Sequence, residues 1–208
     1  VRRFRNGAML ASAAVLFLTL LVTYAISRSL TRPIKQMHQS VAQLTLETLP
    51  DEKAFKIVRQ LSHMDPARKG KYKIIYRDRD YHGTTIGALS ATGQWERKQD
   101  FGPFAEGFAE FAHPLCYRCP FHLSYPSCGT ACADYLKEFF VTHVAAEATA
   151  AVIAEPIQGE GGFITPPPEY FGKLQAICRE HGILFIADEI QTGMGRTGAM
   201  FAMDHWGV

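Results

Sequence analysis

The 208-residue sequence lacks a strong charge of either sign. Its 22 lysine and arginine residues nearly balance 20 aspartate and glutamate residues, and the formal net charge is +2. No basic patch is interleaved with exposed aromatic residues, so we expect no nucleic acid among its partners. Internal repeats and low-complexity tracts are also absent, which excludes repeat architectures and leaves a globular body as the expected form.

One segment near the amino terminus contains no charged residue. Twenty-two residues without a charge separate Arg5 from Arg28, and the apolar core over residues 8–26 is long enough to cross a bilayer. A cleaved signal peptide is the alternative, although its apolar region is normally shorter. We therefore expect residues 1–27 to be a single-pass transmembrane segment. Basic residues on both sides leave its orientation open.

The next segment, residues 28–50, has the apolar spacing of a coiled coil. Steps of four, three, four and three residues separate its apolar positions, which are Leu30, Ile34, Met37, Val41 and Leu44. The segment resembles the first helix of a HAMP linker, the helical bundle that follows transmembrane helices in bacterial sensor proteins. A second linker helix and a signalling domain do not follow.

Short apolar runs predict three buried β-strands, at residues 73–76, 150–154 and 183–187. Amphipathic segments predict a helix that packs through Ala54, Ile57, Val58 and Leu61, and another over residues 169–181. This alternation favours an α/β fold with a mostly parallel sheet. Ligands of such sheets bind beyond the carboxyl ends of the strands.

Two carboxylates follow these runs directly. Glu155 comes after the run at 150–154, and Asp188 comes after the run at 183–187, which we expect to be buried on both faces. An ionised Asp188 can hold a protonated pyridine nitrogen and keep the ring electron-poor, which points to pyridoxal phosphate, and Gln191 can hydrogen-bond the ring hydroxyl. The alternative is that Asp188 only caps a turn or helix.

An aromatic residue, Tyr81, falls in the loop after the first strand, where an exposed ring can lie flat on a heteroaromatic ring. The alternative for Tyr81 is a half-buried packing role. A loop histidine next to glycine, as His82 is, is more typical of a hydrogen-bonded structural residue than of a base.

From residue 51 to residue 208 the sequence resembles a section of the large domain of class III (omega-type) aminotransferases, which are fold-type I pyridoxal phosphate enzymes. Three stretches in the family's order carry the resemblance, and each follows a predicted strand: Tyr81-His82-Gly83-Thr84-Thr85, Ala154-Glu155-Pro156-Ile157-Gln158-Gly159-Glu160-Gly161-Gly162, and Ala187-Asp188-Glu189-Ile190-Gln191-Thr192-Gly193. It covers about three-quarters of the chain but only a middle section of a complete family member.

The resemblance assigns roles to individual residues. It implies that Asp188 and Glu155 are catalytic, Glu155 by pairing with a mobile arginine. It implies that the cofactor is held by five residues, which are Tyr81, His82, Asp188, Ile190 and Gln191, with Tyr81 and Ile190 on opposite faces of its ring. The implied reaction moves an amino group from an amine or amino acid to a 2-oxo acid, in a homodimer, with this part of the chain cytoplasmic.

The sequence departs from the family pattern in two places. Where the family has a Gly-Ser loop for the cofactor phosphate, residues 46–52 contain no glycine, and none of the seventeen residues after Gln191 is the lysine that forms the Schiff base. We therefore expect this chain to be inactive by itself. The alternative function is a non-catalytic membrane signalling fragment that carries an aminotransferase passenger.

The cysteines cluster within one proline-containing region. Four of the five lie within seventeen positions, at Cys116, Cys119, Cys128 and Cys132. Such clustering suggests a zinc site or an iron–sulfur cluster, with structural thiols and disulfides as the alternatives. Cys178 lies on the apolar side of the helix at 169–181, and we expect it in the core.

Overall fold

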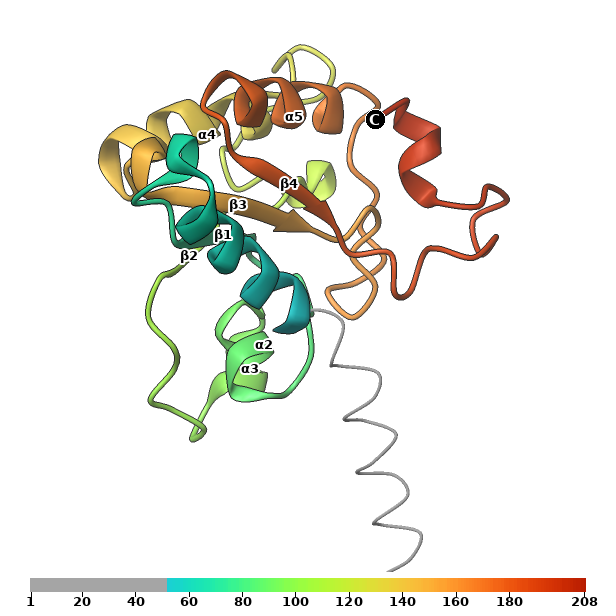
Figure 1. The fold of residues 1–208 in the computed structure, drawn as a ribbon. Helices are drawn as coiled ribbons and strands as arrows, with labels where there is room; N and C mark the ends of the chain where they lie inside the picture. Colours follow the sequence, from blue (N-terminus) through green and yellow to red (C-terminus); the bar gives the residue numbers. More distant parts are fainter. Residues whose placement is uncertain (1–51) are drawn as a thin grey trace, which may run out of the picture. The chain divides into compact units, whose positions relative to one another are not determined.

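The computed structural model describes residues 52–208, which form a four-stranded parallel sheet with helices on both faces (Figure 1). The strand order is β2-β1-β3-β4, and every neighbouring pair is parallel. The strands are β1 (Lys73–Arg77), β2 (Phe108–Phe111), β3 (Thr149–Ala154) and β4 (Leu184–Ala187). The expected α/β class with a parallel sheet is confirmed.

Helices connect the strands and cover the sheet. The longer ones are α4 (Ala131–Thr142), α5 (Tyr170–Glu180) and the helix over residues 52–64, and the shorter ones are α2 (Ile86–Ser90) and α3 (Trp95–Lys98). Short 3₁₀ helices also occur, at η1 (Pro66–Arg68), η2 (Cys116–Arg118), η3 (Ala146–Ala148) and η4 (Ala202–Trp206). Crossover connections of this kind are what parallel strands require.

Alternate residues of the strands pack on opposite faces, as the two-residue period of a strand dictates. Ile75 and Val152 belong to the core that α4 and α5 cover, whereas Ile74 and Ile153 contact Phe55 of the helix at 52–64. Strand β3 is buried along its whole length, so the carboxyl end of this strand is fixed on both sides by packing.

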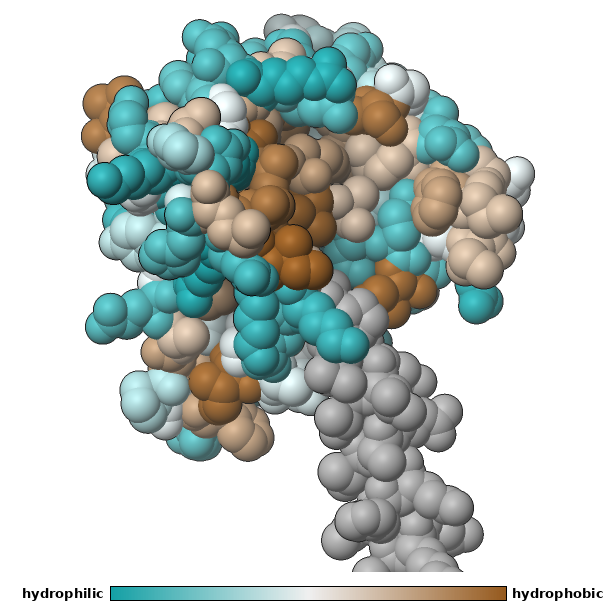
Figure 2. All heavy atoms as spheres, in the orientation of Figure 1, coloured by the Kyte–Doolittle hydropathy of each residue, from teal (hydrophilic) through white to brown (hydrophobic). Residues whose placement is uncertain are grey.

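The strands at residues 73–77, 149–154 and 184–187 confirm the three predicted strands, and α5 confirms the predicted helix at 169–181. The prediction that the run at 183–187 is buried on both faces was wrong, because β4 is half-buried at the edge of the described sheet. Figure 2 shows apolar side chains at the surface where Figure 1 places β4.

The helix at residues 52–64 forms as predicted but buries a different set of side chains. Phe55 and Val58 are buried, whereas Ile57 is 56% exposed and Leu61 is 42% exposed. The predicted packing through Ile57 and Leu61 was therefore wrong, because the sheet contacts the side of the helix that carries Phe55.

The expected transmembrane segment (1–27) and HAMP-like linker (28–50) lie outside the described residues. Within residues 52–208, no helix combines the length and the apolar character that crossing a membrane requires.

Candidate active site at the carboxyl edge of the sheet

Parallel strands bring their carboxyl ends to one edge of the sheet, and the polar residues of this chain gather there. Arg77 ends β1, Glu155 follows β3 and Asp188 follows β4. The backbone N–H of Asp188 still donates to the carbonyl of Ala154 at 2.9 Å, so the sheet ladder continues to this residue and fixes its position. All three side chains are buried, which is unusual for charged residues without partners.

Asp188 accepts one hydrogen bond on each carboxylate oxygen. His82 Nδ1 lies 2.7 Å from Oδ2, and the Ile190 backbone N–H donates to Oδ1 at 3.1 Å. Each oxygen keeps a second lone pair, so the carboxylate can accept a further hydrogen bond from a ligand. The structure thus brings together two of the predicted cofactor-binding residues, which the sequence separates by 106 positions.

His82 owes its position to the turn in which it lies. Its backbone N–H donates to Thr92 Oγ1 at 3.1 Å. The next residue, Gly83, has a φ of 114°, in the left-handed region that favours glycine. The His-Gly pair therefore directs the imidazole into the protein while the chain turns away.

Behind His82 lies a buried ion pair. The Arg77 guanidinium donates from Nε and Nη2 to the two Asp80 oxygens, both at 3.0 Å, and both side chains are fully buried. Burial opposes the charge of Arg77, but Asp80 and Tyr170 together outweigh this effect and raise the pKa of the guanidinium. Asp80 also accepts from Gln158 Nε2, so its carboxylate is heavily hydrogen-bonded.

Glu155 lies next to the Arg77–Asp80 ion pair. Burial raises the pKa of Glu155 to about 8, and the nearby carboxylates of Asp80 and Asp188 contribute to the rise. His82 and Arg77 lower the pKa of Glu155, but their combined effect is smaller than the rise. Glu155 Oε2 has no hydrogen-bond partner among the described residues. At pH 7 this carboxyl is therefore mostly protonated, which reduces the repulsion among the buried acids.

Ile190 and Gln191 line an adjacent pocket of about 590 Å³, together with residues of the loop after β3, among them Gly159 and Phe163. Ile190 is 56% exposed and can contact a ligand. A Cβ on Gly159 would lie 1.7 Å from Gln191 Oε1, so the absence of a side chain at residue 159 is what leaves room for Gln191.

Tyr81 lies apart from that pocket. The guanidinium of Arg97 stacks over its ring at 4.8 Å from the centroid, and Arg97 in turn forms an ion pair with Glu160 at 2.5 Å. Arg97 therefore covers one face of the Tyr81 ring. Only the opposite face is left for the stacking role that we expect.

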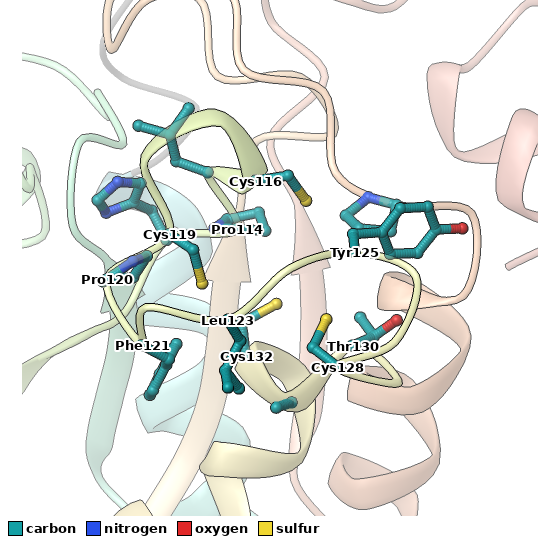
Figure 3. A pocket seen from close by; sticks show the side chains of 14 residues that line it. Pro114, Cys116, Cys119, Pro120, Phe121, Leu123, Tyr125, Cys128, Thr130 and Cys132 are labelled. Atoms are coloured by element: carbon teal, nitrogen blue, oxygen red, sulfur yellow. The ribbon is translucent and has the colours of Figure 1, made fainter.

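Figure 3 shows the four clustered cysteines around one pocket, with apolar neighbours such as Phe121 and Leu123. The free space in the pocket is about 10 Å³, roughly enough for a single water molecule. Burial and the neighbouring thiols raise the pKa of Cys132 to about 11. All four are free thiols.

The zinc or iron–sulfur site expected at Cys116, Cys119, Cys128 and Cys132 is not supported, because no group of three or more His, Cys, Asp or Glu side chains in the described part of the chain is placed to hold a metal ion. The arrangement agrees with the alternative of structural thiols. Cys178 is in the core, as expected.

Three residues of the site escaped the sequence analysis: Arg77, Asp80 and Gln158. A charged quartet, Arg77-Asp78-Arg79-Asp80, directly follows the apolar residues 74–76 of β1, and this is a usable signal because charges at a strand end face the carboxyl edge of the sheet. Gln158 lies within the family motif that begins at Ala154, but its residue type alone did not indicate a role in the site. Its partner Asp80 is 78 residues away in the sequence.

Comparison with known proteins agrees with this geometry. The family model for class-III aminotransferases matches residues 24–208, a range that includes the segment we liken to a HAMP linker. The taurine–pyruvate aminotransferase of Bilophila wadsworthia is 46% identical over 158 residues, which are 76% of this chain and 34% of that protein. A leucine/methionine racemase of Thermococcus litoralis is 43% identical over 131 residues, covering 62% of this chain and 29% of the racemase.

Solved structures agree as well. An amine transaminase from an uncultivated Pseudomonas species, in its PLP-bound form, has a TM-score of 0.73 and 36% identity, over 77% of this chain and 36% of the transaminase. An omega-transaminase from Thermomicrobium roseum has a TM-score of 0.69 and 38% identity, over 76% of this chain and 34% of that chain. The chain belongs to the class-III aminotransferase family. It spans about a third of the length of the curated relatives it matches.

Proposed function

We propose that this chain forms the ring-binding section of a pyridoxal-phosphate-dependent aminotransferase that moves an amino group from an amine or amino acid to a 2-oxo acid. One observation carries the proposal. A buried carboxylate, Asp188, stands at the carboxyl end of β4, is fixed by His82, and retains hydrogen-bonding capacity. Two residues later the chain enters the wall of a large pocket.

The residues present fit the cofactor. Pyridoxal phosphate, when bound, supplies an electron sink for breaking a bond at the substrate Cα. Asp188 would hold the ring nitrogen in its protonated form, because an ionised carboxylate stabilises a cation at hydrogen-bond distance. Ile190 and Gln191 would contact the ring from the pocket side, and Tyr81 would contact it with its remaining face.

Glu155 has a separate role in this proposal. A buried carboxyl whose pKa is about 8 can change its charge near neutral pH, so an arginine or a charged substrate that approaches it can draw off its proton. This supports the expected pairing of Glu155 with a mobile arginine and a position near the substrate.

Grafting tests the function directly. Residues 52–208 replace the matching section of the Bilophila taurine–pyruvate aminotransferase, which supplies the remaining two thirds. We expect the grafted enzyme to form alanine from pyruvate and an amino donor, and the matched Asp188→Asn graft to lose that activity. A well-folded graft that binds the cofactor but transfers no amino group would contradict the proposal.

Racemisation is the second candidate, because the Thermococcus litoralis racemase is 43% identical to this chain over 131 residues, which is close to the 46% over 158 residues of the taurine–pyruvate aminotransferase. Both reactions need a cofactor ring held as Asp188 would hold it. The same graft, incubated with L-leucine and no 2-oxo acid, separates them: formation of D-leucine favours racemisation, and its absence beside alanine formation favours transamination.

We also propose, from the sequence alone, that residues 8–26 anchor the protein in a membrane with residues 51–208 on the cytoplasmic side, and that the complete enzyme is a homodimer. Carbonate extraction of membranes and protease protection test the anchor and its orientation. Recovery of the full chain in the unsedimented fraction would contradict it.

A further inference from the structure

Four free thiols face one another across one small pocket. The segment of η2 carries two of them and the segment that enters α4 carries the other two, and in Figure 3 their sulfur atoms point toward one another: Cys116, Cys119, Cys128 and Cys132. The free space in the pocket is about 10 Å³, which leaves no room for a bound molecule larger than water. Any chemistry of this pocket is therefore chemistry of the thiols themselves.

The fifth cysteine provides a comparison, because it is an isolated core thiol. Burial alone raises the pKa of Cys178 to about 12. Burial also raises the pKa of Cys116, but here two neighbouring thiols add to the rise, and Cys128 adds more than Cys119 does. Among the thiols of the pocket, Cys128 is therefore the neighbour that Cys116 senses most strongly.

The two thiols differ in how firmly they are held. Cys116 is exposed and lies in η2, a single turn whose N-cap makes no side-chain hydrogen bond. Cys128 is half-buried, and the next residue is tied to α5, because Lys173 Nζ donates to the Gly129 backbone carbonyl at 2.6 Å. Cys116 can therefore move to a Cys128 that is fixed in place, as a disulfide bond requires.

We propose that Cys116 and Cys128 form a reactive dithiol, which low-molecular-weight disulfides oxidise to an intrachain disulfide that joins η2 to the entrance of α4. This modification site is separate from the residues of the candidate active site. In this proposal Cys132 stays a buried thiol, and Cys119 is the competing partner that the experiment must exclude.

The reaction balances with the small disulfide as the oxidant. The thiolate of the exposed Cys116 attacks one sulfur of the reagent, so that a mixed disulfide forms and one reagent thiolate leaves. The thiolate of Cys128 then attacks the sulfur of Cys116, forms the protein disulfide and expels the second reagent thiolate. The two thiol protons pass to these thiolates, and the two electrons that the cysteines lose reduce the reagent to two thiols. The second step is intramolecular, so it outruns attack by another reagent molecule.

Glutathione disulfide, added at pH 8 to the fully reduced 208-residue chain, tests the proposal. We expect a product that has lost two hydrogen atoms and carries no glutathione, and dithiothreitol should reverse the change. Digestion with trypsin and chymotrypsin then locates the bond by mass spectrometry. Chymotrypsin cleaves after Phe121 and Leu123, which separates Cys119 from Cys128, so the peptide with Cys116 should be joined to the peptide with Cys128.

Two variants identify the partner of Cys116. Cys128→Ser should stop at the mixed disulfide with glutathione and yield at least about tenfold less internal disulfide than the wild type. Cys119→Ser is the matched control, because Cys119 lines the same pocket and is also half-buried. This control should form the internal disulfide as readily as the wild type. The digest of the wild type gives its answer even if a variant does not fold.

Four outcomes would each overturn the proposal: the wild type stops at mixed disulfides, its digest joins Cys116 to Cys119, Cys119→Ser loses the internal disulfide, or Cys128→Ser keeps it. The last outcome would identify Cys132 or Cys119 as the partner. None of these results bears on the proposed function, because the measurements use no cofactor and no residue of the candidate active site.

Discussion

Replacing the buried acid Glu155 with glutamine should remove a pH dependence from the stability of this protein. Burial raises the pKa of Glu155 from 4.5 to about 8, so between these pH values the folded chain binds a proton that the unfolded chain has released. The stability linked to this proton is fully present below pH 4.5 and is lost as the pH rises toward 8. Glutamine cannot ionise and keeps the shape of the protonated acid.

The size of the effect follows from the shift. Because pH 5.5 and pH 7.5 both lie between 4.5 and about 8, each pH unit lowers the free energy of unfolding by up to about 1.4 kcal/mol, or about 2.7 kcal/mol in all. The advantage of Glu155→Gln over the wild type should grow by that amount between the two pH values.

Urea unfolding at pH 5.5, 6.5 and 7.5 measures the difference. Glu138→Gln is the matched control, because it removes the same charge from an exposed position on α4 and should give a curve parallel to the wild type. If the Glu155→Gln curve is also parallel to the wild type, Glu155 is ionised throughout and our account of the buried acids is wrong.

Three further outcomes follow from the structure. In the grafted enzyme, Asp188→Asn should lower the rate of the amino-transfer half-reaction at least about a hundredfold; stopped-flow rates within tenfold of the parent would refute the ring-nitrogen role. Arg77→Met should destabilise the chain by about 3–5 kcal/mol, because it leaves Asp80 buried without its cation, and a change below about 1 kcal/mol in urea would contradict this. Iodoacetamide at pH 8 should modify Cys132, which is buried with a pKa raised to about 11, at least about tenfold more slowly than the exposed Cys116; equal rates by mass spectrometry would count against the packed-thiol assignment.

The sequence by itself determined three strands and the place of two acids. Three apolar runs are typical of strands in a buried sheet: the run at 73–76 and the runs before Glu155 and Asp188. A carboxylate directly after such a strand lies at the carboxyl edge of the sheet. Helix α5 could also be predicted from the sequence, because its apolar residues repeat with the helical period. The motifs at Tyr81, Glu155 and Asp188 also indicated the family, which the comparisons confirm.

Other elements have weaker sequence patterns. Strand β2 has only four residues, Phe108–Phe111, and α4 follows the cysteine-rich region directly, so neither showed a long periodic pattern. The burial of β4 also depended on its place in the sheet. An apolar run looks the same whether one face or both are covered, and only the strand order put β4 at the edge of the described sheet.

Only the tertiary structure decided which side chains work together. Asp80 meets Gln158 across 78 positions and His82 meets Asp188 across 106, and no local pattern encodes contacts of that range. The raised pKa of Glu155 and the absence of a metal-binding arrangement among the cysteines that the structure describes have the same origin. Both depend on the distances and the burial that folding imposes, whereas the sequence specifies only which groups are available.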